Sequence, residues 1–330
     1  MKTIFFDVRE AEEEFFRREI KGDVRFLPGH AKDYDGADIG QIEVISVFTT
    51  AAVTKSTLER FKNLRLIIAR SVGFSHIDIE YCRARGILVA NTPHYGDYTV
   101  AEFAFGLLLN LARKIYKSAN DLKQGRLGES YSGTELFSKT FGIYGTGAIG
   151  GISAKIARGF TDKILACDVV ENPELTEKYG VKYVDGDELC AKSDILLLHA
   201  PLTKSTRNFL NAERIKSLKP TAFVVNTARG ELIDTRALFE ALSGKQIAGA
   251  ALDVIECESL LFSEQYAGEP TENIDCIRKT LLNHALLNLE NVIVTPHIAY
   301  ETDEATERIL QITKECYKDF TNGKIPQHIV

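Results

Sequence analysis

The segment that most restricts the fold of this 330-residue chain is 141–150, where four strand-forming residues run directly into Gly-Thr-Gly-Ala-Ile-Gly. The glycines Gly145, Gly147 and Gly150 match a turn that ends a strand, brings the backbone close to a pyrophosphate and lets the next helix pack tightly on the strand. The free N–H groups at the start of that helix also favour a phosphate. The segment therefore predicts a parallel α/β domain that binds a dinucleotide.

An acidic residue follows this turn at the spacing that a dinucleotide site needs. A second strand is expected at 163–167, and Asp168 comes directly after it, 18 positions beyond Gly150. A carboxylate at this place binds the hydroxyls of the adenosine ribose and repels the 2′-phosphate of NADP. Residues 169–171 (Val-Val-Glu) contain no arginine that would bind such a phosphate. The sequence therefore favours NAD as the cofactor.

Short β-branched runs alternate with longer amphipathic segments on both sides of a break at 91–97. We expect strands at 3–8, 43–48, 65–69, 87–90, 140–144, 163–167, 181–184, 194–199, 222–226, 248–254 and 292–294, and helices at 11–21, 57–62, 76–85, 98–123, 277–289 and 302–320. This alternation is typical of parallel sheets covered by helices, and the length is about twice that of a typical domain. We therefore predict two doubly wound α/β units. A glycine-rich loop is expected at 125–133, and the connection 259–290 is long for such a fold.

The composition limits the classes of partner. Asp and Glu outnumber Lys and Arg by 46 to 40, and this net charge of −6 argues against nucleic acid, because phosphate binding needs clustered basic residues. No apolar run reaches the ~18 residues of a membrane-spanning helix, and the N-terminus lacks the pattern of a signal peptide, so we expect a cytoplasmic protein. The cysteines are scattered without a Cys-x-x-Cys pair, which predicts free thiols and no metal site. They are Cys82, Cys167, Cys190, Cys257, Cys276 and Cys316.

Three predicted strands of the second unit end in polar residues of complementary chemistry. Arg229 follows the strand at 222–226, the two glutamates Glu256 and Glu258 follow the strand at 248–254, and His297 follows the strand at 292–294. Ligands of open α/β sheets bind beyond the carboxyl ends of the strands. Reduction of a 2-keto acid needs a cation for the carboxylate and carbonyl, which a guanidinium suits, and a proton donor, which an imidazole suits. A carboxylate beside the imidazole would favour its protonated form.

These motifs closely resemble the D-2-hydroxyacid dehydrogenase family over nearly the whole chain. The resemblance rests on 145–150 with Asp168, on Asn-Thr-Ala-Arg-Gly-Glu-Leu-Ile at 226–233, on 249–258 and on Thr-Pro-His-Ile-Ala at 295–299, with further similarity at 70–78, 91–93 and 100–102. It implies that Arg229 binds and polarises the substrate, that His297 is the acid/base and that Glu258 is its partner. Glu256 does not match the family position. The backbone at Val72 and Gly73 is implied to hold the substrate carboxylate.

The resemblance also implies a domain arrangement and a set of cofactor contacts. A Rossmann cofactor domain at 97–297 is expected to interrupt a discontinuous, flavodoxin-like substrate domain formed by 1–96 and 298–330, with the cleft between them. A homodimer is expected through the helical segment 98–123. The implied cofactor contacts are Gly145, Thr146, Gly147, Ala148, Ile149, Gly150, Asp168, Val169, His199, Ala200, Pro201, Thr206, Thr227, Ala228 and Asp253. His199 could equally be a structural histidine at a strand end.

Within the family, Tyr95 and the run 297–303 look most like the D-lactate dehydrogenase branch. Tyr300, Tyr95 and Phe48 could form a small pocket for the methyl group of pyruvate, or could simply be packed in the core. The alternatives are another member of the family (glyoxylate/hydroxypyruvate reductase, D-2-hydroxyisocaproate or phosphoglycerate dehydrogenase) and a non-catalytic NAD(H)-sensing interaction protein. Cys257 precedes Glu258, which raises the hypothesis of thiol-sensitive activity.

Overall fold

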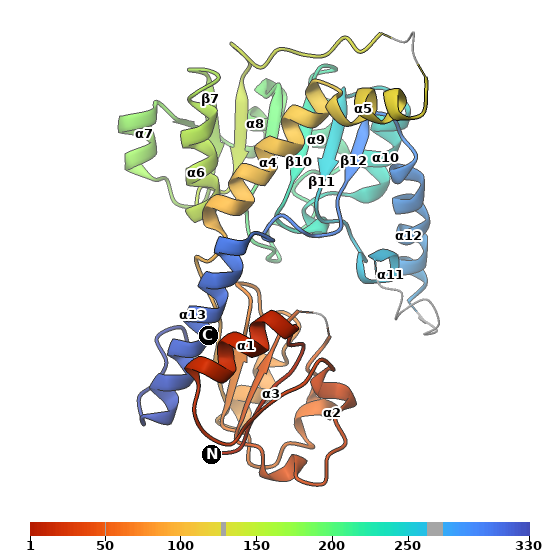
Figure 1. Cartoon of the computed structure of the whole chain (residues 1–330). Coiled ribbons are helices and arrows are strands. Elements are labelled where there is room, and N and C mark those ends of the chain that lie inside the picture. Colours follow the sequence, from red (N-terminus) through yellow and green to blue (C-terminus); the bar gives the residue numbers. More distant parts are fainter. Residues whose placement is uncertain (50, 127–129, 263–272) are drawn as a thin grey trace. The chain divides into compact units, whose positions relative to one another are not determined.

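The computed structural model describes residues 1–49, 51–126, 130–262 and 273–330, which divide into two units (Figure 1). Unit 1 combines Met1–Gly96 with Glu301–Val330, and unit 2 is Asp97–Tyr300. The boundaries expected from the sequence were 96/97 and 297/298, and those of the structure are 96/97 and 300/301. Because the helix after the second boundary belongs with the N-terminal segment, unit 1 is discontinuous in sequence.

The sheet of unit 1 has five parallel strands in the order β2-β1-β3-β4-β5. The strands are β1 (Thr3–Phe5), β2 (Val24–Phe26), β3 (Val44–Val47), β4 (Leu66–Ala69) and β5 (Leu88–Ala90). This order is that of flavodoxin-like folds. The sequence pattern did not predict β2, because Val-Arg-Phe is short and only its last residue is buried.

Helices cover both faces of this sheet. On one face α1 (Glu10–Glu19) and α13 (Asp303–Thr321) bury Phe16 and Tyr317 against Phe5. On the other face α2 (Lys55–Leu58) and α3 (Ile79–Ala84) pack with the short 3-10 turns at Ala31–Asp33 and Ile39–Gln41. The apolar face of the C-terminal helix is thus part of the core of unit 1.

The sheet of unit 2 has seven parallel strands in the order β12-β11-β10-β9-β6-β7-β8. They are β6 (Phe141–Tyr144), β7 (Ile164–Cys167), β8 (Lys182–Tyr183), β9 (Ile195–Leu198), β10 (Phe223–Asn226), β11 (Gly249–Leu252) and β12 (Val292–Val294). Counted within the unit this is the Rossmann order 3-2-1-4-5-6 with a seventh strand added. The direction of the strand order reverses between β6 and β9, and the crevice at such a reversal is where these folds bind dinucleotides.

Two separate apolar cores hold helices on the faces of this sheet. One core joins the sheet to α4 (Asp97–Ala112), α6 (Ala148–Ala157) and α7 (Pro173–Tyr179). The other joins it to α8 (Gly186–Lys192), α9 (Ala212–Ser217) and α10 (Thr235–Ser243), with α12 (Ile274–Leu287) packed on α10 and β12. The remaining elements are α5 (Ile115–Lys123), α11 (Ser259–Phe262) and the 3-10 turn Gly230–Leu232.

The prediction of one helix over 98–123 was wrong. α4 ends at Ala112 and α5 begins at Ile115, because Lys114 between them adopts a left-handed conformation with φ 53°. The side chain of Asn110 accepts a hydrogen bond of 2.8 Å from the N–H of Tyr116, which satisfies the start of the second helix. Within the predicted loop 125–133 and the long connection 259–290, residues 127–129 and 263–272 lie outside the described residues.

The prediction that all six cysteines are free was also wrong. Cys257 and Cys276 form a disulfide, with Cα atoms 5.7 Å apart, whereas Cys82, Cys167, Cys190 and Cys316 are free. The two bonded residues are 19 positions apart, and only the fold brings the start of α12 beside the end of the β11 segment. No helix among the described residues is long and apolar enough to cross a membrane.

Candidate active site

The glycine turn between β6 and α6 has two crowded glycines and one open glycine. Gly145 has φ 89°, and a Cβ there would lie 2.5 Å from the backbone nitrogen of Ala200. A Cβ at Gly150 would overlap the carbonyl oxygen of Gly145. Nothing lies within 4 Å of a Cβ built at Gly147, the residue that caps α6. The open position is therefore where a pyrophosphate could approach the backbone and the N-terminus of α6, which begins with Ala148 and Ile149.

Asp168, at the carboxyl end of β7, is oriented by the same turn. Its Oδ2 accepts hydrogen bonds from the N–H (2.5 Å) and the hydroxyl (3.1 Å) of Thr146, and its Oδ1 accepts one from the N–H of Val169 (2.6 Å). The side chains of Val169 and Val170 are 96% and 74% exposed. A fixed carboxylate beside exposed apolar side chains suits a ribose diol and an adenine ring.

The residues after β9 face the same turn. Nε2 of His199 is 2.9 Å from the hydroxyl of Ser153 on α6, and burial lowers the pKa of His199 to about 4. This histidine is therefore neutral and joins β9 to α6. Ala200 is buried against Gly145, and the hydroxyl of Thr206 donates to the carbonyl of Pro201 (2.6 Å).

Arg229 follows β10 in a loop whose backbone is fixed by the side chain of Asn226. The side chain of Asn226 accepts a hydrogen bond from the N–H of Ala228 (3.0 Å) and donates one to the carbonyl of Arg229 (2.9 Å). The hydroxyl of Thr227 is buried and has no hydrogen-bond partner among the described residues. A Cβ at Gly230 would overlap the backbone of residues 255 and 256, so only glycine lets this loop lie against the segment that leads to Glu258.

The loop that carries His297 is held by Asp253, which is fully buried at the end of β11. The carboxylate of Asp253 accepts hydrogen bonds from the hydroxyl of Thr295 (2.6 Å) and from the N–H groups of Ile298 (3.0 Å) and Ala299 (2.9 Å). Its carbonyl accepts the N–H of His297 (3.0 Å). Asp253 thus fixes the loop of the histidine, while the cofactor contact expected for it stays a prediction.

His297 and Glu258 form a hydrogen-bonded ion pair. Nδ1 of His297 donates to Oε1 of Glu258 at 2.7 Å, with side chains 40% and 32% exposed. Burial lowers the pKa of His297, but the hydrogen bond and charge of Glu258 outweigh it. The pKa is therefore raised above its ordinary value, although the positive charge of Arg229 opposes the shift. The imidazole ring lies nearly perpendicular to the ring of Tyr300, with ring centroids 6.5 Å apart. Unit 2 therefore brings together a cation, a carboxylate and an imidazole that holds a proton above its usual pH range.

The other predicted substrate residues belong to unit 1. Val72 and Gly73 lie in the loop after β4, where the hydroxyl of Ser71 donates to the carbonyl of Gly73 (2.6 Å) and the side chain of Asn91 donates to the carbonyl of Val72 (2.8 Å). These bonds fix the two carbonyl groups of the loop. Phe48 is partly buried, and Tyr95 is buried, with its carbonyl bonded to Arg308 (2.6 Å).

Comparison with known proteins decides the family. The family model described as "D-isomer specific 2-hydroxyacid dehydrogenase, NAD binding domain" matches residues 105–299, which is more than half of the chain. The chain belongs to the D-2-hydroxyacid dehydrogenase family.

Relatives and solved structures of this family match most or all of this chain. The D-lactate dehydrogenase of Lactiplantibacillus plantarum is 34% identical over 97% of this chain and 96% of its own length. The glyoxylate reductase of Thermococcus litoralis is 35% identical over 88% of this chain and 84% of its own length. The crystal structure of the Aquifex aeolicus D-lactate dehydrogenase, complexed with NAD and lactic acid, has a TM-score of 0.90 at 34% identity. It covers 100% of this chain and 99% of that chain.

The NAD-binding domain of this dehydrogenase has features that fit the cofactor. The open backbone at Gly147 suits the pyrophosphate, Asp168 suits the ribose, and the unpartnered buried hydroxyl of Thr227 lies just past the end of β10. Sequence reasoning missed Asp253 as the residue that positions the histidine, and it missed Cys276 and Lys279, which contact the segment before Glu258. Their spacing in the sequence carries no signal of these contacts.

Proposed function

We propose that this NAD-dependent dehydrogenase of the D-2-hydroxyacid family is a D-lactate dehydrogenase, which interconverts pyruvate and D-lactate. The proposed catalytic role of these residues rests on the 2.7 Å hydrogen bond between His297 and Glu258, with Arg229 close enough to influence the pKa of the histidine. The substrate is supported by the likeness to the D-lactate dehydrogenases of Aquifex aeolicus and Lactiplantibacillus plantarum.

The roles of the side chains follow from their chemistry. Bound NADH supplies a hydride to the carbonyl carbon of the keto acid. Nδ1 of His297 is occupied by Glu258, so Nε2 is the nitrogen that donates a proton to the carbonyl oxygen. The guanidinium of Arg229 binds the substrate carboxylate and polarises the carbonyl. Glu258 keeps the imidazole protonated and oriented. After Nε2 has given its proton to the substrate, Glu258 favours the uptake of a new proton by the imidazole.

We propose further substrate contacts on the same grounds. The N–H groups of Val72 and Gly73 bind the carboxylate, and Tyr300, Tyr95 and Phe48 contact the methyl group. The position of Tyr300 beside His297 supports its part in this pocket. Glyoxylate reduction is the second candidate, because the Thermococcus litoralis glyoxylate reductase is as similar in sequence as the D-lactate dehydrogenases are.

A panel of keto acids tests the proposed substrate. The oxidation of NADH is followed at 340 nm with pyruvate, glyoxylate, hydroxypyruvate, 2-ketoisocaproate and phosphohydroxypyruvate, and kcat/KM is compared. We expect the largest value with pyruvate. A larger value with another acid would retain the dehydrogenase mechanism and reject the proposed pocket. Binding of NADH without turnover of any acid would favour an NAD(H)-sensing protein instead.

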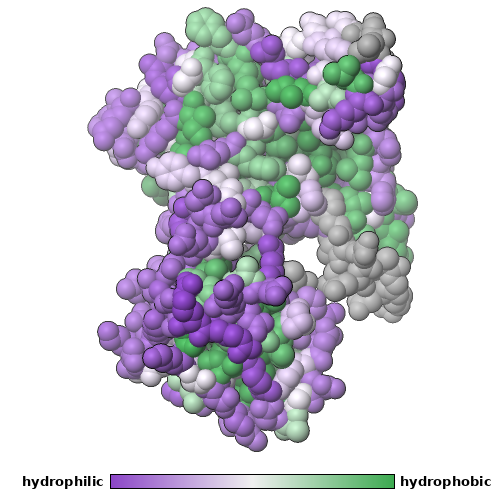
Figure 2. Space-filling model, viewed as in Figure 1, coloured by the Kyte–Doolittle hydropathy of each residue, from purple (hydrophilic) through white to green (hydrophobic). Residues whose placement is uncertain are grey.

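We also propose a homodimer, formed through α4 and α6 of unit 2. An open groove of about 640 Å³ between these helices is lined mostly by apolar and aromatic side chains, among them Tyr98, Phe105, Ile152 and Phe160, together with the charged Glu102 and Lys155. Figure 2 shows hydrophobic side chains gathered over these helices on the face in view.

We also propose the cytoplasmic location that the sequence predicts. The disulfide is the observation against this location, because disulfides are rare in the cytoplasm.

A further inference from the structure

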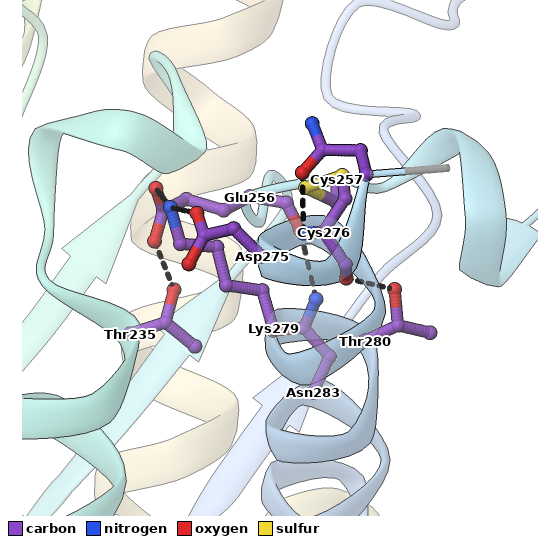
Figure 3. Close-up of a disulfide and its surroundings, with 9 residues drawn as sticks. Thr235, Glu256, Cys257, Asp275, Cys276, Lys279, Thr280 and Asn283 are labelled. Carbon is purple, nitrogen blue, oxygen red and sulfur yellow. Dashed lines mark hydrogen bonds and ion pairs between the residues drawn. A yellow bond between two sulfur atoms is a disulfide. The ribbon is translucent and has the colours of Figure 1, made fainter. Parts of the chain in front are cut away.

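The residue two positions before Glu258 is anchored to α12 and α10 by a buried network (Figure 3). Glu256 is only 4% exposed, and its Oε1 forms an ion pair of 2.8 Å with Nζ of Lys279. Its Oε2 accepts a hydrogen bond from the hydroxyl of Thr235 (2.7 Å), and its carbonyl accepts one from the side chain of Asn283 (2.8 Å). A buried carboxylate with this many partners leaves the backbone at 256 little freedom.

The residue directly before Glu258 is anchored by a covalent bond. Cys257 is bonded to Cys276, in the first turn of α12 (Figure 3). The backbone of Cys257 has φ 56°, a left-handed conformation that a non-glycine residue keeps only where its surroundings enforce it. The disulfide and the Glu256 network are therefore two independent anchors of the backbone from which the Glu258 side chain projects.

The carbonyl of Glu258 accepts a hydrogen bond from the N–H of Leu261 (3.0 Å), whereas its side chain has a single hydrogen-bond partner among the described residues. Its Oε1 holds the imidazole of His297, while its Oε2 is buried and has no hydrogen-bond partner among the described residues. The histidine loop is fixed separately by Asp253. The position of His297 in the ion pair thus depends on Asp253. The position of Glu258 depends on the disulfide and on the Glu256 network, which both lead to α12.

We propose that the Cys257–Cys276 disulfide and Lys279 are positioning residues for Glu258, so that the activity of the enzyme depends on the redox state of this cysteine pair. A dithiol is the class of reductant that would act on it. The dithiol donates two electrons and two protons, the Sγ–Sγ bond breaks, each cysteine sulfur becomes a thiol, and the dithiol closes into its own disulfide. This inference rests on the proposed function, because its readout is the reduction of a keto acid.

The first test uses the unmodified enzyme. Thiol titration of the denatured, untreated protein should find four free thiols among the six cysteines. Treatment with dithiothreitol should expose six, lower kcat for pyruvate reduction by about 10-fold and move the alkaline fall of the rate to lower pH, because Glu258 no longer holds the imidazolium firmly. Binding of NADH, followed by its fluorescence, should not change. Six free thiols before treatment, or the same pH profile before and after, would overturn the proposal.

Variants separate the disulfide from side effects of the reductant. The double variant Cys257→Ser with Cys276→Ser should behave like the reduced enzyme and should not respond to dithiothreitol. Lys279→Met should also shift the pH profile, whereas Asp275→Asn removes only the exposed second partner of Lys279 and should keep the profile of the unmodified enzyme. Should Lys279→Met fail to fold, the reduction of the unmodified enzyme still decides the question.

The two proposals fail in different ways. Absence of turnover with every keto acid, while NADH still binds, would contradict the proposed function. Turnover that is the same in the oxidised, reduced and doubly substituted enzymes would leave the proposed function intact and contradict the positioning role.

Discussion

At the scale of residues, both partners of the ion pair are held by unusual backbone conformations. His297 and Cys257, which precedes Glu258, each have φ 56°. Such conformations persist where the surroundings enforce them, and they concentrate at functional sites. Asp253 enforces the first through the N–H groups of residues 298 and 299, and the disulfide enforces the second. The pair is therefore preorganised before substrate binds, which is what proton transfer requires.

Replacement of Glu258 should change the pH dependence of the reaction. Keto-acid reduction needs protonated His297, so its rate falls as the pH rises through the pKa of the histidine. Since Glu258 raises this pKa, Glu258→Gln should move the fall to lower pH by about one unit or more and reduce kcat at neutral pH by about 10²-fold. D-lactate oxidation needs neutral His297, so its rate increases as the pH rises through the pKa of the histidine. In the same variant this increase should begin at a lower pH.

Initial rates across a pH series in both directions would measure this. Glu177→Gln, an exposed change on α7, is the matched control and should keep the profile of the unmodified enzyme. An unchanged profile in Glu258→Gln would show that another group sets the protonation of the histidine.

At the scale of elements, most strands and helices follow from local sequence pattern, and each wrong prediction has a physical cause. The runs at 141–144 and 223–226 are strongly apolar and were predicted within a residue. The break between α4 and α5 depends on one left-handed residue, Lys114, for which the sequence has no signal. The disulfide is a long-range pairing, which the spacing of two cysteines cannot predict. Arg229 and His297 were found by their places at strand ends and Glu258 by the family resemblance, but the supporting roles of Asp253 and Lys279 were not foreseen.

The glycine turn allows a paired test of stability against cofactor binding. Gly145→Ala places a Cβ against the backbone of Ala200 in a left-handed conformation, so it should lower the free energy of unfolding by about 1–3 kcal/mol. Gly147→Ala meets nothing in the protein and should leave stability nearly unchanged, but its methyl group lies where a pyrophosphate would approach. It should therefore weaken NADH binding.

Thermal unfolding and NADH fluorescence titrations would measure the two effects separately. Tight NADH binding by Gly147→Ala, with unfolding like that of the unmodified protein, would contradict the placement of the pyrophosphate at this turn.

At the scale of the whole molecule, each unit has its own sheet and its own pair of cores. The two parallel sheets could be foreseen from the alternation of apolar runs, and the membership of α13 in unit 1 from the family resemblance. The groove between α4 and α6 is a feature of the folded surface, since its apolar residues come from helices that are separated in sequence. A second chain would cover these side chains and remove them from water.

The proposed dimer can be tested in that groove. Gly106 is exposed on α4, and nothing lies within 4 Å of a Cβ built there. Gly106→Arg should leave the fold intact, because arginine favours helices by about 1 kcal/mol over glycine, but its charge should disrupt an apolar interface. Sedimentation should find two 36.7 kDa chains together in the unmodified protein and in Gly106→Ala, and single chains in Gly106→Arg. A dimer that persists in Gly106→Arg would place the interface elsewhere.

The central claim is that His297, paired with Glu258, protonates a keto acid as NADH is oxidised. The most direct test measures the turnover of pyruvate, with the handedness of the lactate determined, in the unmodified enzyme and in His297→Ala. We expect D-lactate from the unmodified enzyme and a loss of kcat by about 10²–10⁴-fold in His297→Ala, with NADH binding retained. Substantial D-lactate formation by His297→Ala, or L-lactate from the unmodified enzyme, would contradict the account.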